Sequence, residues 1–265
     1  MTALAPYQVE AYNTAHASEN KIHDDAVAKQ FGFGGGLVPG VDVYAYMTHQ
    51  PVARWGRAWL ERGTAECRFA KPVYDGDRTT VSAAEDGAGM AIEVSARGIT
   101  CATGRADLPA PKAIPSLADF PKVAERSSRP PASPESLPVG QWLGIEPVLC
   151  TPELAAEYLH NVRETAGIYA AEGLVHPVVV LRMCNFALNR NVTLGPWMHV
   201  GSKVQNFAPA KIGDALGVRA KVTANYEHKG HLFVDIDVLV TADDERPIAR
   251  VDHISIYRPR QVLAA

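Results

Sequence analysis

The residues best suited to chemistry gather in one short stretch near the N-terminus. It runs Ser18-Glu-Asn-Lys-Ile-His-Asp-Asp25 and places one histidine, His23, among several carboxylates. The glycine-rich segment Gly32–Gly40 follows and leads into an apolar run that begins at Val41. An ordinary histidine pKa of ~6.5 suits proton transfer, and free N–H groups at a helix start can stabilise a developing oxyanion. We therefore take this stretch as a candidate acid–base site beside a helix N-terminus.

Local patterns predict the elements that position this stretch. Helical spacing of apolar residues predicts a long helix from Val41 to about Trp55. A helix is also predicted from Pro6 to about Ala17, because proline suits a first helical turn, and a short helical piece over Asp25–Gln30. Runs of residues bounded by turn residues predict four strands: Thr64–Phe69, Arg78–Ala84, Met90–Gly98 and Thr100–Leu108.

A proline-rich segment separates this pattern from a second copy of it. Eight of the nineteen prolines fall between Pro109 and Pro138, which is typical of a linker. Three groups of residues then recur at nearly constant offsets: Pro6, Tyr12 and Ile22 as Pro152, Tyr158 and Ile168; Gly36–Val38 as Gly173–Val175; Trp59, Gly63, Phe69 and Ala70 as Trp197, Gly201, Phe207 and Ala208. The sequence thus predicts a duplication, with an N-terminal repeat at 1–108, a linker at 109–138 and a C-terminal repeat at 139–265.

The second copy repeats the order of helix and strands. Its counterpart of the long helix is predicted at Pro177–Leu188, and its strands at Gly217–Tyr226, Leu232–Ala242 and Ile248–Tyr257. We interpret Trp59 and Trp197 as matched core anchors of the two copies. One long helix on an antiparallel sheet, twice over, predicts an α+β fold.

Composition narrows the class of protein. A net charge of −3 disfavours nucleic-acid and anionic-membrane partners. The four cysteines are scattered without CxxC spacing, which favours reduced thiols in a cytoplasmic protein. Neither a signal peptide nor an apolar run of the ~18 residues needed for a membrane helix is recognisable. The glycine segment fits neither a dinucleotide-binding nor a P-loop pattern, and the other histidines lack metal-ligand spacing, so no metal site is expected.

Several phrases together resemble the MaoC-like acyl dehydratases and (R)-specific enoyl-CoA hydratases in their double-hotdog form. That family's signature looks like Asp-x-Asn-Pro-x-His, then a short helix, Gly-Phe, and a loop ending in His-Gly before the central helix. The matching phrases occur here in the same order: Asn20-Lys-Ile-His23, Gly32-Phe33, Leu37-Val-Pro-Gly40 and Phe69-Ala-Lys-Pro-Val-Tyr-Asp-Gly-Asp77. The resemblance spans about Pro6 to Tyr257 and implies a double hotdog fold.

The resemblance also implies an activity and roles for residues. It implies a hydro-lyase that hydrates a trans-2-enoyl thioester or dehydrates a 3-hydroxyacyl thioester, without a cofactor. The substrate would be an acyl-CoA or acyl-carrier thioester, and a homo-oligomer remains open. His23 would be the acid/base, Asn20 the signature asparagine, and the N–H of Gly40 or Val41 the donor to the thioester carbonyl. Thr48 falls where some members have a serine near the site.

One departure affects this assignment. The family's acidic residue lies five positions before the histidine, and that position here is Ser18. A serine hydroxyl can orient a water but needs an activator to act as a base. Glu19 is our first candidate for the missing acid, with Asp24 and Asp25 as others. The second copy has Glu164 and Tyr169 at the acid and histidine positions, and we expect the two places to lie well apart.

Each assignment has a structural alternative. His23 is otherwise a turn histidine, Glu19 a solvated carboxylate, Gly40 a glycine that loop geometry requires, and Thr48 a packing residue. Three functions therefore remain open from the sequence. They are a hydratase or dehydratase, a hotdog thioesterase that would use Asp42 on the central helix, and a non-catalytic acyl-binding or partner subunit, which Ser18 favours.

Overall fold

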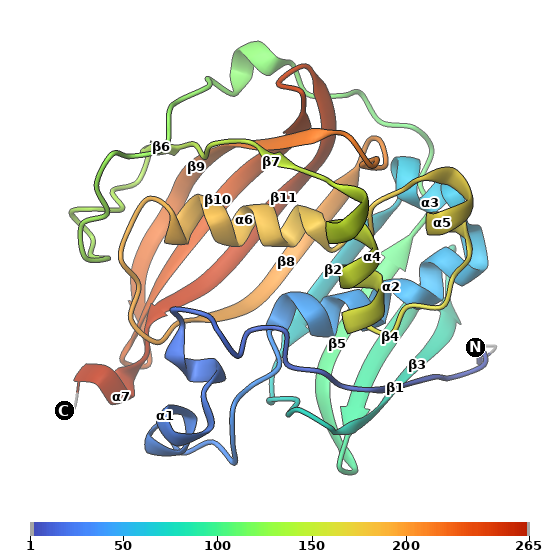
Figure 1. The fold of residues 1–265 in the computed structure, drawn as a ribbon, viewed down its shortest axis with the longest axis horizontal. Helices are drawn as coiled ribbons and strands as arrows, with labels where there is room; N and C mark the ends of the chain where they lie inside the picture. The colour runs from blue at the N-terminus through green and yellow to red at the C-terminus, as the bar shows by residue number, and fades with distance from the viewer. Residues whose placement is uncertain (1–2, 264–265) are drawn as a thin grey trace.

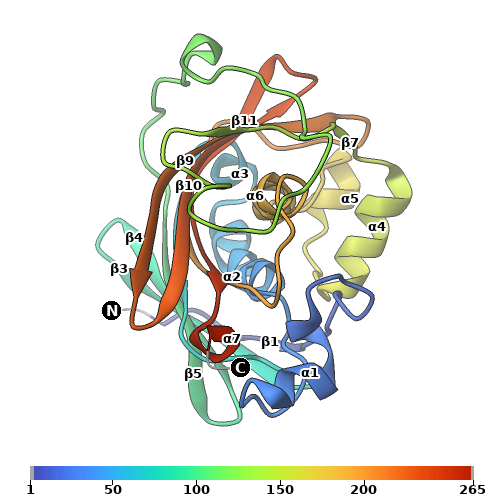
Figure 2. The same ribbon diagram turned by 90° about the vertical axis from the view of Figure 1, so that its left-hand side faces the viewer.

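The computed structural model describes residues 3–263, which form one antiparallel sheet with helices on one face (Figure 1). Figure 2 shows the sheet nearly edge-on, with α2, α4, α5 and α6 on the same side of it. The strands are β1 Tyr7–Glu10, β2 Thr64–Phe69, β3 Arg78–Asp86, β4 Gly89–Ala96, β5 Ile99–Asp107, β6 Trp142–Leu143, β7 Val148–Leu149, β8 Met198–Asn206, β9 Ala215–His228, β10 His231–Ala242 and β11 Arg246–Arg258.

The helices fall into two long central ones and several short ones. The α-helices are α1 Asp25–Gln30, α2 Gly40–Trp55, α3 Arg57–Arg62, α4 Pro152–Asn161, α5 Ile168–Glu172, α6 Val179–Asn189 and α7 Arg260–Leu263, and the 3-10 helices are η1 Lys21–His23 and η2 Leu117–Asp119. The predicted central helices and seven predicted strands agree with these bounds to within two residues at each end.

The strand order shows how the two copies join. It runs β1-β3-β4-β5-β2-β8-β11-β10-β9-β6, with β7 also paired to β9, so each copy contributes one half of the sheet. The halves meet where β2 and β8 pair antiparallel. Glu66 and Lys203, which lie 137 positions apart like Leu37 and Leu174, face each other directly across this joint. The two halves are therefore related by a pseudo-twofold axis that passes beside this pair.

The central helices fill the concave side of the sheet. In α2, buried residues occur on all sides, because the helix lies between the sheet and the segments that precede and follow it. In α6, Leu181, Cys184 and Leu188 are fully buried, whereas Arg182 and Asn189 are only partly covered. The inward residues of the strands alternate with exposed ones, as in β2, where Ala65 and Cys67 are buried and Glu66 and Arg68 are exposed.

The helix predicted at Pro6–Ala17 is wrong. Residues Tyr7–Glu10 form the edge strand β1, which pairs with β3 from Tyr7 opposite Val81 to Glu10 opposite Arg78. Buried Val9 lies between exposed Gln8 and Glu10, which is the period of a strand. A proline at the start was a weak signal for a helix, and edge pairing with β3 decided the outcome. The corresponding segment of the second copy is the short strand β7, because Cys150 after it bonds to Asp214 and Gly213 as Ala11 after β1 bonds to Asp77 and Gly76.

Two further interpretations also change. The segment 109–138 is not a loose connection, since Phe120 and Leu137 are buried and the Arg219 side chain donates hydrogen bonds to the Leu117 and Phe120 carbonyls. The two tryptophans are both buried, but they lie in different elements, because Trp59 belongs to α3 and Trp197 directly precedes β8. Hydrogen-bonded equivalents, such as Val38–Val73 and Val175–Ala210, follow an offset of 137 rather than 138.

None of the helices within residues 3–263 combines the length and apolar character needed to cross a bilayer. The division at 108 and 139 into repeats and linker remains our proposal.

Candidate active site

The segment that carries His23 folds into a hydrogen-bonded turn followed by η1. The Asn20 side chain caps η1 by accepting a hydrogen bond from the Ile22 N–H. The Ser18 hydroxyl oxygen accepts one from the Asn20 N–H at 3.1 Å. Ser18 thus supports the turn, a role that short polar side chains often take.

The His23 imidazole is held in one orientation by the loop before α2. Its Nδ1 lies 2.7 Å from the Leu37 carbonyl oxygen. A carbonyl only accepts hydrogen bonds, so Nδ1 carries the proton and Nε2 keeps a lone pair. Burial, only partly offset by the Leu37 hydrogen bond, lowers the pKa of His23 below its ordinary value. The ring is therefore a neutral base at pH 7.

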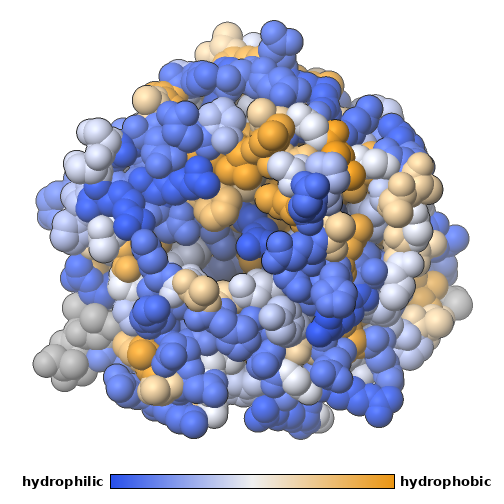
Figure 3. Space-filling model, in the orientation of Figure 1, coloured by the Kyte–Doolittle hydropathy of each residue, from blue (hydrophilic) through white to orange (hydrophobic). Residues whose placement is uncertain are grey.

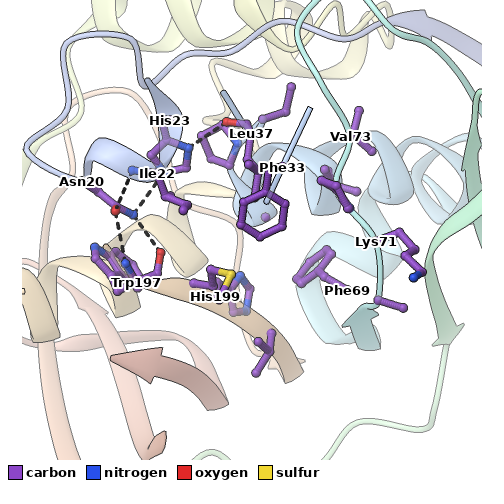
Figure 4. A pocket seen from close by; sticks show the side chains of 18 of the residues that line it. Asn20, Ile22, His23, Phe33, Leu37, Phe69, Lys71, Val73, Trp197 and His199 are labelled. Atoms are coloured by element: carbon purple, nitrogen blue, oxygen red, sulfur yellow. Dashed lines mark hydrogen bonds between the residues drawn. The ribbon is translucent and has the colours of Figure 1, made fainter. Parts of the chain in front are cut away.

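Asn20 joins this turn to the second copy. Its amide nitrogen donates to the Trp197 carbonyl at 3.0 Å, and its oxygen accepts from the Trp197 N–H at 3.2 Å. The same nitrogen lies 3.3 Å from His23 Nε2 (Figure 4). This pairing fixes which end of the amide faces the histidine. Asn20 therefore positions His23 against the start of β8.

Two adjoining cavities open beside His23. The inner cavity has a volume of about 150 Å³ and apolar walls that include Phe33, Phe69 and Val73. The outer cavity measures about 460 Å³ and is lined by polar groups, including three arginines. Both share the residues Asn20, His23, Pro39, Asn185 and Trp197. The face that carries α6 is hollowed near its centre, between α6 and α2 (Figure 3).

The start of α2 offers unused hydrogen-bond donors to these cavities. The helix begins at Gly40, and the Asp42 and Val43 N–H groups donate to the Pro39 carbonyl. In the described part of the chain the Gly40 and Val41 N–H groups have no acceptor. Gly40 lines the inner cavity and Val41 the outer one. This arrangement agrees with the helix start expected from the sequence.

Close packing also favours a glycine at position 40. A Cβ atom there would lie 3.3 Å from His199 Nδ1 and 3.4 Å from the Phe69 ring. The glycine lets the β8 side of the cavity approach the helix start closely.

The expected carboxylate partner does not contact His23. The Glu19 side chain is 79% exposed and bonds to Arg129 at 3.0 and 3.3 Å. Asp24 caps α1, and Asp25 accepts the Gly36 N–H at 2.6 Å. Within residues 3–263, no hydrogen bond or ion pair joins His23 to a carboxylate. The expectation that Glu19 supplies the missing acid at His23 is therefore wrong for this conformation.

Thr48 also lies elsewhere than expected. Its hydroxyl donates to the Ala45 carbonyl at 2.8 Å and lies 3.5 Å from His176 Nε2, away from the His23 cavities. The reason is the pseudo-twofold arrangement, in which each central helix contributes to the site of the other copy. The residue at the Thr48 offset on α6 is Asn185, and it lines both cavities beside His23.

The counterpart site in the second copy is closed. Its residues, including Val175, Pro177 and Ala210, enclose only about 10 Å³. Glu164 fills the neighbouring space by bonding to His49 Nδ1 at 2.9 Å and lying 3.6 Å from His176 Nε2.

His49 and His176 stabilise the negative charge of Glu164. Burial raises the pKa of Glu164, but the neighbouring His176 ring and the hydrogen bond with His49 outweigh burial and hold it well below its ordinary value. Tyr169, at the histidine position, is buried against the His176 ring at 5.1 Å between centroids. These side chains seal the second site.

Sequence reasoning missed Asn185, Lys71 and His199 as residues that line the site. A signal for Asn185 existed, since the duplication relates it to Thr48. His199 and Lys71 come from strand ends that only the assembled sheet brings together. No group of three or more His, Cys, Asp or Glu side chains in the described residues is arranged to hold a metal ion.

Comparisons with known proteins find similar folds among solved structures. No protein-family model matches the sequence, and neither does any curated protein. Among solved structures, a Mycobacterium tuberculosis protein with a double hotdog fold is 16% identical, with a TM-score of 0.63 over 96% of both chains. A Chloroflexus aurantiacus protein described as a MaoC domain dehydratase is 12% identical, with a TM-score of 0.66 over 97% of this chain and 95% of that one.

A third similar structure carries a different description. It is a Novosphingobium aromaticivorans protein described as a thioesterase, 12% identical, with a TM-score of 0.54 over 96% of both chains. At these identities the likeness is one of fold. The two-helix, single-sheet arrangement of this chain is a double hotdog fold.

Proposed function

We propose that this protein hydrates enoyl thioesters, or dehydrates 3-hydroxyacyl thioesters, at the cavity beside His23. The observation that carries the proposal is the pairing of a neutral imidazole lone pair with free N–H groups at a helix start on the walls of adjoining cavities. A base and an oxyanion site are the two parts that addition of water to an enoyl thioester needs. The dehydratase and thioesterase descriptions of proteins with this fold support a thioester substrate.

One imidazole is sufficient to balance this reaction. In the hydration direction, His23 Nε2 takes a proton from water while the water oxygen bonds to C3 of the enoyl group. The electron pair of the double bond moves to the carbonyl oxygen, where the N–H groups of Gly40 and Val41 stabilise the resulting enolate. The protonated His23 then delivers its proton to C2, and the imidazole returns to its neutral form. Dehydration is the reverse of these steps.

The outer cavity suits the carrier part of the substrate. Arg129, Arg182 and Arg190 line it, and guanidinium groups bind phosphates well. Arg129 and Arg190 already pair with acidic side chains, whereas Arg182 has no ion-pair partner within residues 3–263 and lies over the Tyr158 ring. A CoA or phosphopantetheine carrier has phosphates of the required charge.

The arrangement disfavours the thioesterase alternative. Asp42 is fully buried, and its two carboxylate oxygens accept hydrogen bonds from the Thr14 hydroxyl and the Tyr158 hydroxyl, both at 2.6 Å. It lines neither cavity beside His23. Asp42 therefore links α2 to the N-terminal segment and to α4, and it is not placed to attack a thioester.

A second candidate is a non-catalytic acyl-thioester binding protein. The observation that favours it is that Ser18 caps the turn and no carboxylate of the described residues bonds to His23. If that candidate is correct, the cavity binds the thioester without turnover.

A spectrophotometric assay separates these functions. Hydration of crotonyl-CoA removes its enone absorbance without releasing a free thiol, whereas a thioesterase releases the thiol. We expect absorbance loss with no thiol release, and we expect His23→Ala to lower the rate by roughly 10²–10⁴. His16→Ala, at a largely exposed histidine seven positions away, is the matched control and should keep the wild-type rate.

Two results would contradict the proposal. Full activity in His23→Ala would remove His23 as the base. Crotonyl-CoA binding without absorbance loss would establish the binding protein instead.

A further inference from the structure

A second histidine lines the inner cavity, on the β8 side. The His199 side chain is 92% buried, as only 8% of its surface is exposed. Its ring contacts the edge of Phe69 at 4.8 Å between centroids. Figure 4 shows that it comes from β8, whereas His23 comes from η1. Its Nδ1 has no hydrogen-bond partner in the described residues and lies next to Gly40.

His199 is the first member of a buried hydrogen-bonded chain. Its Nε2 lies 2.8 Å from the Ser202 hydroxyl, and that hydroxyl lies 2.9 Å from His253 Nδ1. The two rings stack with centroids 4.2 Å apart. Beyond them, His253 Nε2 is also without a partner in the described residues. This hydrogen-bonded chain thus runs from His199 in the cavity wall to the completely buried His253.

Three arrangements of protons fit this chain with both rings neutral. In the first, His199 Nε2 donates to Ser202, Ser202 donates to His253 Nδ1, and His253 Nε2 holds an N–H. In the second, His253 Nδ1 donates to Ser202, Ser202 donates to His199 Nε2, and His199 Nδ1 holds the N–H. In the third, both rings donate to the two lone pairs of the Ser202 oxygen, and neither outer nitrogen holds a proton.

Burial decides between these arrangements. His253 Nε2 and His199 Nδ1 are both buried and have no partner in the described residues. An unpaired buried N–H is rarer in proteins than an under-used acceptor, so the third arrangement suits the ligand-free protein. An acceptor bound in the cavity beside His199 favours the second arrangement, because it pairs with the Nδ1–H that this arrangement provides.

We propose that His199 donates a hydrogen bond from Nδ1 to the thioester carbonyl oxygen, together with the free N–H groups at the start of α2. Gly40 and His199 line the same inner cavity, and Nδ1 lies 3.3 Å from the position that a Cβ atom on Gly40 would take. This role rests on the proposed function, since it assumes a thioester in that cavity. His199 is then a catalytic residue, and Ser202 and His253 are positioning residues that hold its proton on Nδ1 when the carbonyl is bound.

The donor is suited to its task because it stays neutral. Burial lowers the pKa of His199 to about 3 and lowers that of His253 well below its ordinary value. A neutral imidazole polarises a carbonyl without placing a full charge in an apolar cavity. It also remains an N–H donor over the whole range in which His23 is a base.

Polarisation of a bound carbonyl is measurable without turnover. The probe is 4-(dimethylamino)cinnamoyl-CoA, an enoyl thioester whose absorption moves to longer wavelength when its carbonyl accepts strong hydrogen bonds. We expect a red shift on binding to the wild-type protein and a much smaller one with His199→Leu. His199→Asn should restore most of the shift, because its amide nitrogen can occupy the place of Nδ1.

Steady-state kinetics provide a second test of this role. Loss of one oxyanion donor should lower kcat by on the order of 10² while KM changes little. His199→Asn should recover part of kcat. A merely structural role predicts instead that Leu and Asn variants lose stability and activity in parallel, with an unchanged red shift for the folded fraction, and that result would overturn the proposal.

The proton position can be tested with the probe bound. Long-range ¹H–¹⁵N NMR distinguishes Nδ1–H from Nε2–H histidines, and we expect His199 to carry Nδ1–H in the complex and Ser202→Ala to weaken that preference. An Nε2–H form in the complex would overturn the assignment. A red shift with no hydration would contradict the proposed reaction yet support the donor, so the two failures are distinguishable.

Discussion

At the scale of single residues, the site depends on backbone carbonyls rather than on a second charged side chain. The Leu37 carbonyl holds the His23 proton on Nδ1, and the Trp197 backbone holds Asn20. Burial then keeps the histidine uncharged. A base of this kind needs no carboxylate for its orientation. It is therefore compatible with a serine, Ser18, at the position of the acidic residue.

Glu19 should matter little for the reaction. Glu19→Gln removes an exposed ion pair with Arg129 and leaves the His23 contacts unchanged, so kcat should stay within about twofold of the wild type. The crotonyl-CoA assay checks this directly. A rate loss as large as that of His23→Ala would show that Glu19 swings into the cavity during turnover.

At the scale of elements, each central helix provides residues for the site at the start of the other. The start of α2 faces Asn185 on α6, and Thr48 on α2 lies at the closed counterpart. Arg182 lies one turn before Asn185, and both line the outer cavity.

Arg182 should therefore bind the carrier rather than take part in proton transfer. With Arg182→Met, KM for crotonyl-CoA should rise by about ten- to a hundredfold, because a hydrogen bond to a charged group contributes about 1.5–3 kcal/mol. KM for the short N-acetylcysteamine thioester should not change. Arg54→Met, at an exposed arginine of α2 outside both cavities, is the control. Equal effects on both substrates would contradict a carrier role.

Asp42 should affect stability and not chemistry. It joins α2 to the N-terminal segment through Thr14 and to α4 through Tyr158. Asp42→Ala leaves the buried Tyr158 hydroxyl and the half-buried Thr14 hydroxyl without their acceptor and should lower the free energy of unfolding by about 2–3 kcal/mol. Asp42→Asn retains hydrogen-bonding capacity and should cost less. Urea unfolding measures both, and a loss of kcat in folded Asp42→Asn would revive the thioesterase alternative.

At the scale of the whole molecule, buried neutral histidines couple folding to pH. His199 and His253 have lowered pKa values in the folded state, so the unfolded chain binds their protons more readily. For groups of this kind stability is complete above the unfolded pKa of ~6.5 and falls as pH decreases below it. Glu164 acts in the same direction at still lower pH, because its folded pKa is also lowered.

The expected size of this effect is measurable. Between pH 7.5 and pH 5 the shift of His199 alone should reduce the free energy of unfolding by about 2 kcal/mol, and the shift of His253 should add to this loss. Urea unfolding at intermediate pH values gives the slope, and His253→Asn should make it shallower. A free energy that stays constant down to pH 5 would mean that these rings are already protonated or solvated in the folded protein.

The sequence by itself determined the elements and the duplication. Alternating and helical patterns are local, because they reflect which face of a strand or helix is buried, and they located β2–β5, β9–β11 and both central helices. The turn that carries His23 and the helix start at Gly40 were also recognisable, because capping and glycine requirements involve neighbours in the chain. Only the segment at Tyr7–Glu10 changed type, since an edge strand depends on the sheet that it joins.

The tertiary structure alone decided which side chains share the cavity. The pairing of β2 with β8 and the crossing of the two copies bring Asn185, Trp197 and His199 to a site whose base lies more than 150 positions earlier in the chain. It also turned Glu19 outward and placed Thr48 at the closed counterpart. No local pattern encodes these outcomes, because they depend on packing between segments that are distant in sequence.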